Sequence, residues 1–275
     1  MNFILNKEHY LSTNSPNRPS FISFNTTLKK VSAESYNELA LISKEKGLTK
    51  KVIYFYKKAL ELRVLNLGTL NRKTISSFNR LAEAYFDAKM TMESLDLYGK
   101  SLMLNKILFG KDSLEVASVY SALANIHFGE ENLEEAFSFY SQALKIREIH
   151  LGDKHPLTAN SQHELAYFYA ASEEYALALP LFEKSLEVRI ELYRLSHPET
   201  AKSYNSLAMC HYHLFHYDKA YVYLLEAIRI KEMILPKNDE GLLSCKMNLK
   251  EIKKNFLKEK KDTFFESVFG WIKSF

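Results

Sequence analysis

Three histidines lie close together in the segment HYHLFHYDKA, residues 211–220. Histidine is the commonest metal ligand, so this density first suggests a metal site. On a helix, however, His211 and His213 point about 200° apart and cannot hold one ion together. His213 and His216 could do so only if the helix continued through Phe215, and two ligands alone make a poor zinc site. We therefore expect ordinary core and surface histidines here, with no metal ion and no other cofactor.

Two further histidines, His155 and His197, each precede a proline and could be mistaken for catalytic groups. Both belong to a column of residues spaced 42 apart that also contains Asn71, Ser113 and Asp239. Asn, Ser and Asp are favoured helix N-caps, and proline is tolerated in the first turn of a helix. We therefore interpret both histidines as helix entries.

Motifs typical of enzymes are absent from the sequence. It contains no G-x-G-x-x-G, P-loop, H-E-x-x-H or G-x-S-x-G pattern. The acidic cluster at residues 130–135 lies around an expected helix start, where carboxylates interact favourably with the helix dipole. We predict that the protein is not an enzyme.

The larger pattern behind these residues is a repeat with a period of 42. Leucine recurs at this spacing six times: Leu39, Leu81, Leu123, Leu165, Leu207 and Leu249. An alanine follows each of the first five leucines: Ala40, Ala82, Ala124, Ala166 and Ala208. A constant stride of this length is typical of stacked supersecondary units, each of which buries its apolar face against the next.

Each unit reads as two helices. In the third unit, Val116, Tyr120 and Leu123 recur at helical spacing, and so do Ala136 and Tyr140 further along the chain. The chain has only 8 Gly and 6 Pro, which favours long helices joined by few loops. Three glycines at the same stride are expected to end second helices: Gly68, Gly110 and Gly152.

These units resemble the tetratricopeptide repeat. In the third unit the matching residues are Leu123, Ala124, Leu133, Ala136, Tyr140 and Ala143. The stride is longer than the usual 34 residues and is similar to the 42-residue repeats of kinesin light chains. The resemblance implies an all-α fold, an α–α superhelix (a TPR-like solenoid) of about five helix hairpins plus a C-terminal capping helix. The expected parts are an N-terminal arm over residues 1–31, the array over 32–249 and a capping or amphipathic segment over 250–275.

In such arrays the first helix of each pair lines a concave surface. The residue two positions before the repeated leucine is expected to face it, and asparagine there can donate to and accept from a peptide backbone. The alternative is a polar residue on a solvated helix face. Aromatic residues beside this column could form pockets for a ligand's side chains. The candidate partner-binding residues are Asn37, Asn79, Asn125, His163, Tyr167, Asn205 and Tyr212.

The two ends differ from the repeats. Residues 1–31 show no helical period, although Phe21, Ile22 and Phe24 could dock on the first unit. Residues 250–275 combine a lysine-rich stretch with a run of aromatic residues at amphipathic spacing. That segment could pack on the array or fill its groove, bind a partner, or lie on an anionic membrane surface through residues 262–275.

Composition limits the possible function classes. The net charge of +4 is too small to indicate nucleic-acid binding. Two cysteines far apart suggest a reducing compartment, and the first 21 residues lack the apolar run of a secretory signal, so we expect a cytoplasmic protein. We predict an adaptor that binds a peptide or helix of another protein in its groove; its oligomeric state stays open. The alternative is a peripheral membrane protein anchored by the C-terminal helix.

Overall fold

The computed structural model describes residues 32–193 and 196–273, with side chains up to residue 261. Within these ranges the chain forms eleven α-helices and no β-strand, which confirms the all-α prediction. The helices are α1 (Ala33–Glu45), α2 (Thr49–Leu67), α3 (Arg72–Asp87), α4 (Thr91–Phe109), α5 (Leu114–Gly129), α6 (Leu133–Leu151), α7 (Pro156–Ala171), α8 (Tyr175–Tyr193), α9 (Pro198–His213), α10 (Tyr217–Ile234) and α11 (Glu240–Lys273). Five hairpins therefore precede one long final helix.

Small residues set the distance between the two helices of each hairpin. The alanine that follows the repeated leucine is fully buried in all five units. The facing column on the second helix is equally buried and holds Ala59, Ser101, Ala143, Ser185 and Ala227. Side chains of this size let two helix backbones approach closely, and the larger residues fill the space around them.

The helix boundaries follow the predicted punctuation. The Nδ1 atom of His155 accepts a hydrogen bond from the backbone N–H of Leu157 at 3.1 Å, and His197 caps α9 in the same way. The interpretation of both histidines as helix entries is thereby confirmed. Gly68, Gly110 and Gly152 end helices with positive φ, as expected.

The turns inside the hairpins were not foreseen in detail. Each places one residue at φ of 60–67°, in the left-handed region that favours glycine. Only the first hairpin has glycine there; the column is Gly47, Lys89, Glu131, Glu173 and Phe215.

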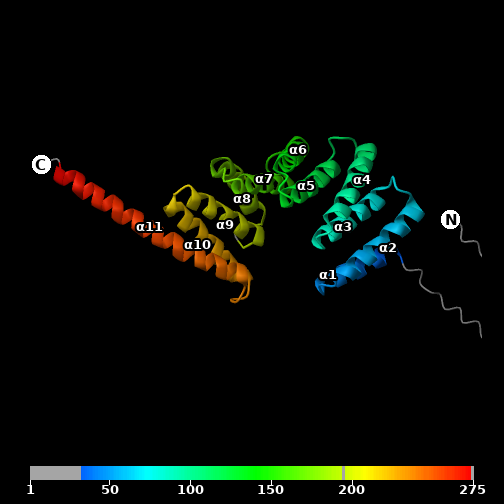
Figure 1. The fold of residues 1–275 in the computed structure, drawn as a ribbon, viewed down its shortest axis with the longest axis horizontal. Helices are drawn as coiled ribbons and strands as arrows, with labels where there is room; N and C mark the ends of the chain where they lie inside the picture. Colours follow the sequence, from blue (N-terminus) through cyan, green and yellow to red (C-terminus); the bar gives the residue numbers. More distant parts are fainter. Residues whose placement is uncertain (1–31, 194–195, 274–275) are drawn as a thin grey trace, which may run out of the picture.

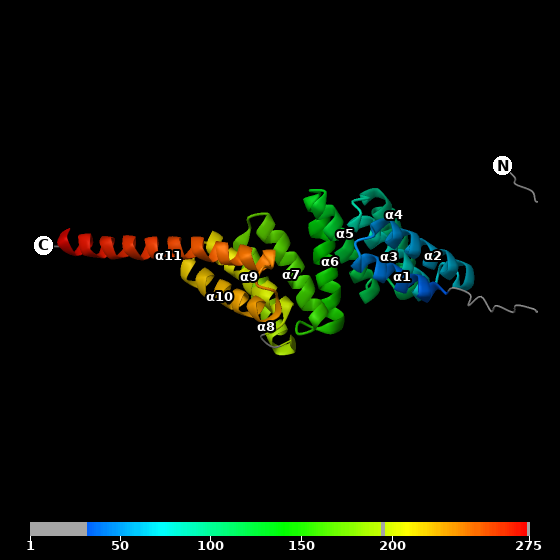
Figure 2. The ribbon, with the colours of Figure 1, turned by 90° about the horizontal axis from the view of Figure 1, so that it is seen from below.

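The hairpins follow one another along an arch (Figure 1), and the view turned by 90° shows the same order (Figure 2). Helices α1, α3 and α5 lie on the inner side of α2, α4 and α6. Helix α5 also contacts α7, and α7 contacts α9, as expected for helices on the inner side of a curved stack. The odd-numbered helices of the five hairpins are therefore called the inner helices, and their exposed side is called the inner face.

Helix α11 covers the last hairpin and then leaves the array. Its first turns pack against α10 and bury Leu242, Cys245 and Ile252. Its backbone runs without a break through residue 250, where a segment boundary was expected, and continues away from the array in both views (Figures 1 and 2). This course does not fill the groove.

Part of the end-segment predictions cannot be followed further. The arm over residues 1–31, with Phe21, Ile22 and Phe24, lies outside the described residues, and so do the side chains of residues 262–275. Among the helices of the described part, none has both the length and the apolar character needed to cross a membrane.

Candidate functional site

Exposed positions on the inner helices define the surface that a partner could touch. The residue two positions after the repeated leucine is exposed or half-buried in every unit; the column is Leu41, Glu83, Asn125, Tyr167 and Met209. One turn later comes an exposed column of Glu45, Asp87, Gly129, Ala171 and His213. The inner face therefore changes from acidic in the first two units to aromatic and apolar in the last two.

A pocket of about 230 Å³ opens on the inner face between α7 and α9. It is lined by Tyr167, Ala170, Ala171, Tyr175, Phe182, Asn205, Ser206, Met209, Cys210 and His213. Phe182 and Cys210 are buried, and the rings of Tyr175 and His213 stack with centroids 4.5 Å apart. Burial raises the pKa of the Cys210 thiol to about 11, so this sulfur is neutral near pH 7 and is not an activated nucleophile.

The structure separates the predicted partner-binding residues into three groups. Tyr167 and Asn205 meet in the pocket, and Asn125 is exposed on the inner face, where its Oδ1 accepts from Tyr140 Oη at 2.6 Å. Asn37 and His163 are buried, so neither can touch a ligand in this arrangement.

Asn79 and Tyr212 are both half-buried. The Oδ1 of Asn79 has no hydrogen-bond partner among the described residues. The Tyr212 hydroxyl donates to Glu251 of α11 at 2.9 Å, so Tyr212 connects the last inner helix to the capping helix. A partner-binding role for the accessible members of the set stays a prediction.

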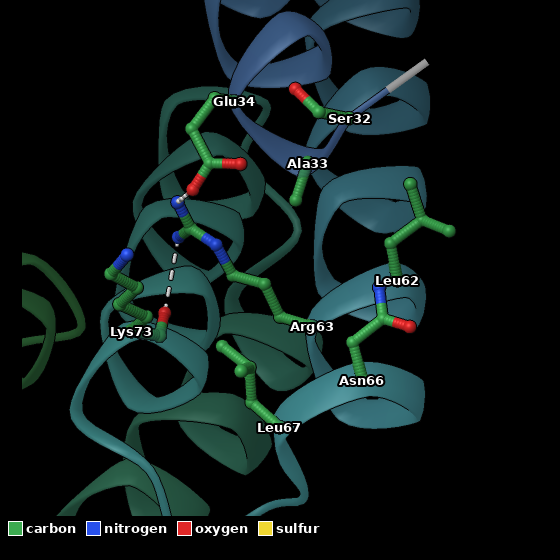
Figure 3. A pocket seen from close by; sticks show the side chains of 8 residues that line it. All are labelled: Ser32, Ala33, Glu34, Leu62, Arg63, Asn66, Leu67 and Lys73. Atoms are coloured by element: carbon green, nitrogen blue, oxygen red, sulfur yellow. Dashed lines mark hydrogen bonds and ion pairs between the residues drawn. The ribbon is translucent and has the colours of Figure 1, made fainter. Parts of the chain in front are cut away.

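Buried His163 lies against one of three buried arginines, Arg63, Arg147 and Arg189, which the sequence analysis missed. Arg189 Nη1 lies 3.3 Å from His163 Nδ1, and Arg147 Nη1 donates to Ser121 Oγ at 3.0 Å. Figure 3 shows the first member, Arg63, which donates to the Lys73 carbonyl at 3.1 Å and contacts Glu34 at 3.3 Å. The residue two before the leucine is buried in these three units, and in the third and fourth it contacts the arginine of its own hairpin.

Each buried arginine also bonds to a serine fourteen residues later, on the first helix of the next unit. Arg63 donates to Ser77 at 2.8 Å and Arg189 to Ser203 at 2.6 Å, and Arg147 bonds to Ser161. The column that contains these arginines reads Arg63, Asn105, Arg147, Arg189 and Lys231. The partner column reads Ser77, Val119, Ser161, Ser203 and Cys245. The two columns change together, since both units without arginine also lack the serine. Asn105 is matched by Val119, and Lys231 contacts Cys245 at 3.1 Å.

Burial lowers the pKa of the Arg147 and Arg189 guanidinium groups, and the nearby acids Glu164 and Glu199 act in the opposite direction. Arg189 reaches Glu199 Oε2 at 2.9 Å, whereas Arg147 lies 3.9 Å from Glu164 Oε2. Buried charges need such partners, because an unpaired one costs several kcal/mol. These groups therefore connect neighbouring units.

The three histidines of the 211–216 segment occupy different environments. His211 is buried and stacks on Tyr223 with centroids 5.3 Å apart, while His213 lies in the pocket rim. His211 Nδ1 lies 3.4 Å from His216 Nδ1, a pair that the helix-based analysis did not consider because a turn separates them. In the described part of the chain, no three His, Cys, Asp or Glu side chains are placed to hold a metal ion.

The paired columns generate a prediction for the inter-unit hydrogen bonds. Arg147→Asn should destabilise the protein by about 3 kcal/mol, because it leaves Ser161 and Glu164 without their cation. Ser161→Val alone should cost about 1–2 kcal/mol. The double variant copies Asn105 and Val119, the equivalent pair at the junction of the second and third units. We expect its loss of unfolding free energy to be at least about 1 kcal/mol smaller than the sum of the two single losses. Urea unfolding measures all three free energies.

The control combines Arg147→Asn with Ser203→Val, because Ser203 bonds to Arg189 instead. The effects of these two changes on the free energy of unfolding should add. Additive energies in both double variants would show that the columns are not energetically coupled.

Buried His163 generates a pH prediction. Burial, together with the charges of Arg189 and Lys202, lowers its pKa to about 2. In the unfolded chain the pKa is about 6.5, so below that pH only the unfolded state gains the proton and stability falls as the pH falls. Lowering the pH from 7.5 to 5 should therefore cost about 2 kcal/mol through this residue. His163→Asn, the residue found in three other units, should remove that part of the loss.

Urea midpoints at several pH values measure the effect, and the exposed His150→Asn variant is the control. An unchanged pH dependence in His163→Asn would contradict a buried neutral imidazole.

The comparisons with known proteins agree with this geometry. The sequence profile described as tetratricopeptide repeat matches residues 73–149, 115–167 and 157–233, which together cover more than half of the chain. No curated protein matches the sequence.

Solved structures with the same fold include three of low sequence identity. A putative kinesin light chain with nearly identical TPR-like repeats from Podosopora anserina is 20% identical, with a TM-score of 0.60 over 74% of this chain and 97% of that one. BtubC (BKLC) from P. vanneervenii is 20% identical, with a TM-score of 0.61 over 81% and 84%. Aspartyl phosphate phosphatase F from Bacillus subtilis is 19% identical, with a TM-score of 0.66 over 88% and 60%. At these identities the likeness shows the fold alone, whereas the profile match and the 42-residue stride show that the chain belongs to the tetratricopeptide repeat family.

Proposed function

We propose that the protein is a non-catalytic adaptor that holds a peptide or helix of a partner protein against its inner face. The observation that carries this proposal is the pocket between α7 and α9, where an apolar floor, an aromatic rim and one amide side chain converge. Proteins of this family generally serve as interaction scaffolds, which supports the same general class of function.

The size of the pocket favours a side chain over a free small molecule. Its volume of about 230 Å³ lies below the range of about 300–1,000 Å³ that is usual for small-molecule and cofactor sites. A single large aliphatic or aromatic side chain would fit between Tyr167 and Met209. The anchor of the partner is therefore proposed to be one apolar residue.

A polar group beside the pocket can orient the partner's backbone. Asn205 lines the pocket, and its Oδ1 accepts from Cys245 Sγ at 3.3 Å. The amide nitrogen of the same side chain can then donate to a peptide carbonyl. Asn125, two units earlier on the inner face, is placed to act on a more distant part of the same peptide.

Charge on the inner face constrains the rest of the partner. In the first two units Lys44 is neutralised by Glu83 at 2.9 Å and by Asp87 at 3.0 Å, and Glu45 lies one residue further along α1. Acids therefore outnumber bases there, and an acidic segment would be repelled. The proposed partner is neutral or basic where it crosses these units.

Peptide display on the intact chain tests this proposal. We expect selected peptides to share an aliphatic or aromatic anchor, and Tyr167→Ala to weaken their binding at least about tenfold, since a buried aromatic anchor contact is worth more than 1.4 kcal/mol. Fluorescence anisotropy with labelled peptides gives the dissociation constants.

Tyr54→Ala is the matched control, because Tyr54 is as exposed as Tyr167, at 53% against 55%, but lies on α2, outside the inner helices. It should leave the affinity unchanged. Equal losses in both variants, or selected peptides without an apolar anchor, would contradict a groove anchored at this pocket.

A further inference from the structure

The first hairpin presents an apolar end face that every later hairpin buries. Leu39 and Ile42 of α1 are 40% and 47% exposed. Their equivalents in the other four units are at most 7% exposed: Leu81, Leu123, Leu165 and Leu207 for the first, and Ala84, Ile126, Phe168 and Cys210 for the second. The difference lies in the neighbours, since the residue types are similar.

In later units the preceding second helix covers this face. Leu81 of α3, for example, belongs to one cluster with Val52 and Tyr56 of α2. At the other end of the array α11 covers the last hairpin and buries Leu242 and Ile252. A terminal repeat that faces water normally carries polar residues on its outer side. The first hairpin instead keeps the apolar residues of an internal one, so a cover is expected at this end too.

We propose that this end face is covered by residues 21–24 of the same chain, the sequence Phe-Ile-Ser-Phe. These residues lie shortly before Ser32, the N-cap of α1, and supply three large apolar side chains. Leu39 and Ile42 lie about 10–15 Å along α1 from that cap, at about 1.5 Å per residue. The eight residues from Phe24 to Ser32 span up to about 26 Å when extended, so the segment reaches the whole face.

Charge around the face suits this occupant. Glu38 and Glu45 are exposed on α1 beside Leu39 and Ile42, and one exposed base, Lys46, follows at the C-cap of the helix. Residues 1–31 carry four basic side chains and a single acid. The basic segment therefore meets two acids and one base on this part of α1, whereas a second copy of the same face would add two more acids.

A cavity at the start of α1 also supports a cover at this end of the array. A cavity of about 320 Å³ lies beside Ser32 and Ala33, between the start of α1 and the end of α2 (Figure 3). Leu62 in its wall is half-buried, whereas the equivalent residues Leu104, Ile146 and Val188 are buried. Apolar surface thus lies open where the preceding residues join the first helix.

Cysteine cross-linking in the full chain tests the proposal without removing any of its apolar contacts. Both natural cysteines are buried, which keeps the background low. Under mild oxidation at low protein concentration, Ser23→Cys with Glu38→Cys should form an intrachain disulfide at least tenfold faster than Ser23→Cys with Glu61→Cys. Glu61 is an exposed acid of α2, so the charge change is matched.

A second measurement is amide exchange. Changing Phe21, Ile22 and Phe24 together to Ser should speed exchange in α1 severalfold and leave α5–α8 unchanged, while the same change of Phe3, Ile4 and Leu5 should have no effect on α1. Equal cross-linking rates in the two cysteine pairs, interchain disulfides through Glu38→Cys alone, or unchanged exchange in α1 would each overturn the proposal.

Discussion

A hairpin of two helices in this protein cannot bury its own apolar surface. Its helices approach through small residues such as Ala124 and Ala143, which are almost completely buried, and this contact uses only one side of each helix. The repeated leucine on the other side becomes buried only when the preceding hairpin packs against it. Because every hairpin meets this requirement at the same 42-residue stride, the units stack in order along the chain, and a curved array with an inner face follows (Figure 1).

The same packing decides which polar groups are structural. Arg147 and Arg189 lie between successive inner helices and bond to serines of the next unit, so their charges join the hairpins. His163 belongs to this network, although its chemistry alone would suggest a site. Recognition is left to the side of the inner helices that faces away from the second helices. There the chain places a pocket between Tyr167 and Met209.

Sequence patterns predicted those features that depend on neighbours along the chain. The repeat, the helix pairs and the capping role of His155 and His197 all follow from local spacing, and the structure confirms them. The sequence analysis was less successful in deciding which residues of the first helices face a partner. Positions two before and two after the leucine lie about 40° apart on a helix, one turn apart in height, so periodicity does not separate them. Only the structure shows that buried Arg189 packs against the turn that contains His163. His163 is therefore buried, whereas Tyr167, one turn later, stays exposed.

The 42-residue stride did contain a signal for the buried arginines, because arginine and its serine partner recur along the chain at multiples of the leucine spacing. Two other features depend on which neighbour is present and cannot be read from a periodic pattern. One is the exposure of apolar side chains at the ends of the array, and the other is contact across a turn, such as that between His211 and His216.

Removing one complete repeat is the most direct test of neighbour-dependent stacking. A chain that begins at Asn71, the N-cap of α3, lacks α1 and α2 but retains every later contact. Its circular dichroism should decrease only by the share of the two missing helices, and urea should unfold the remaining four hairpins cooperatively at a lower midpoint. Loss of most of the helical signal would contradict this account, because it would show that the units share one core and do not stack as repeats.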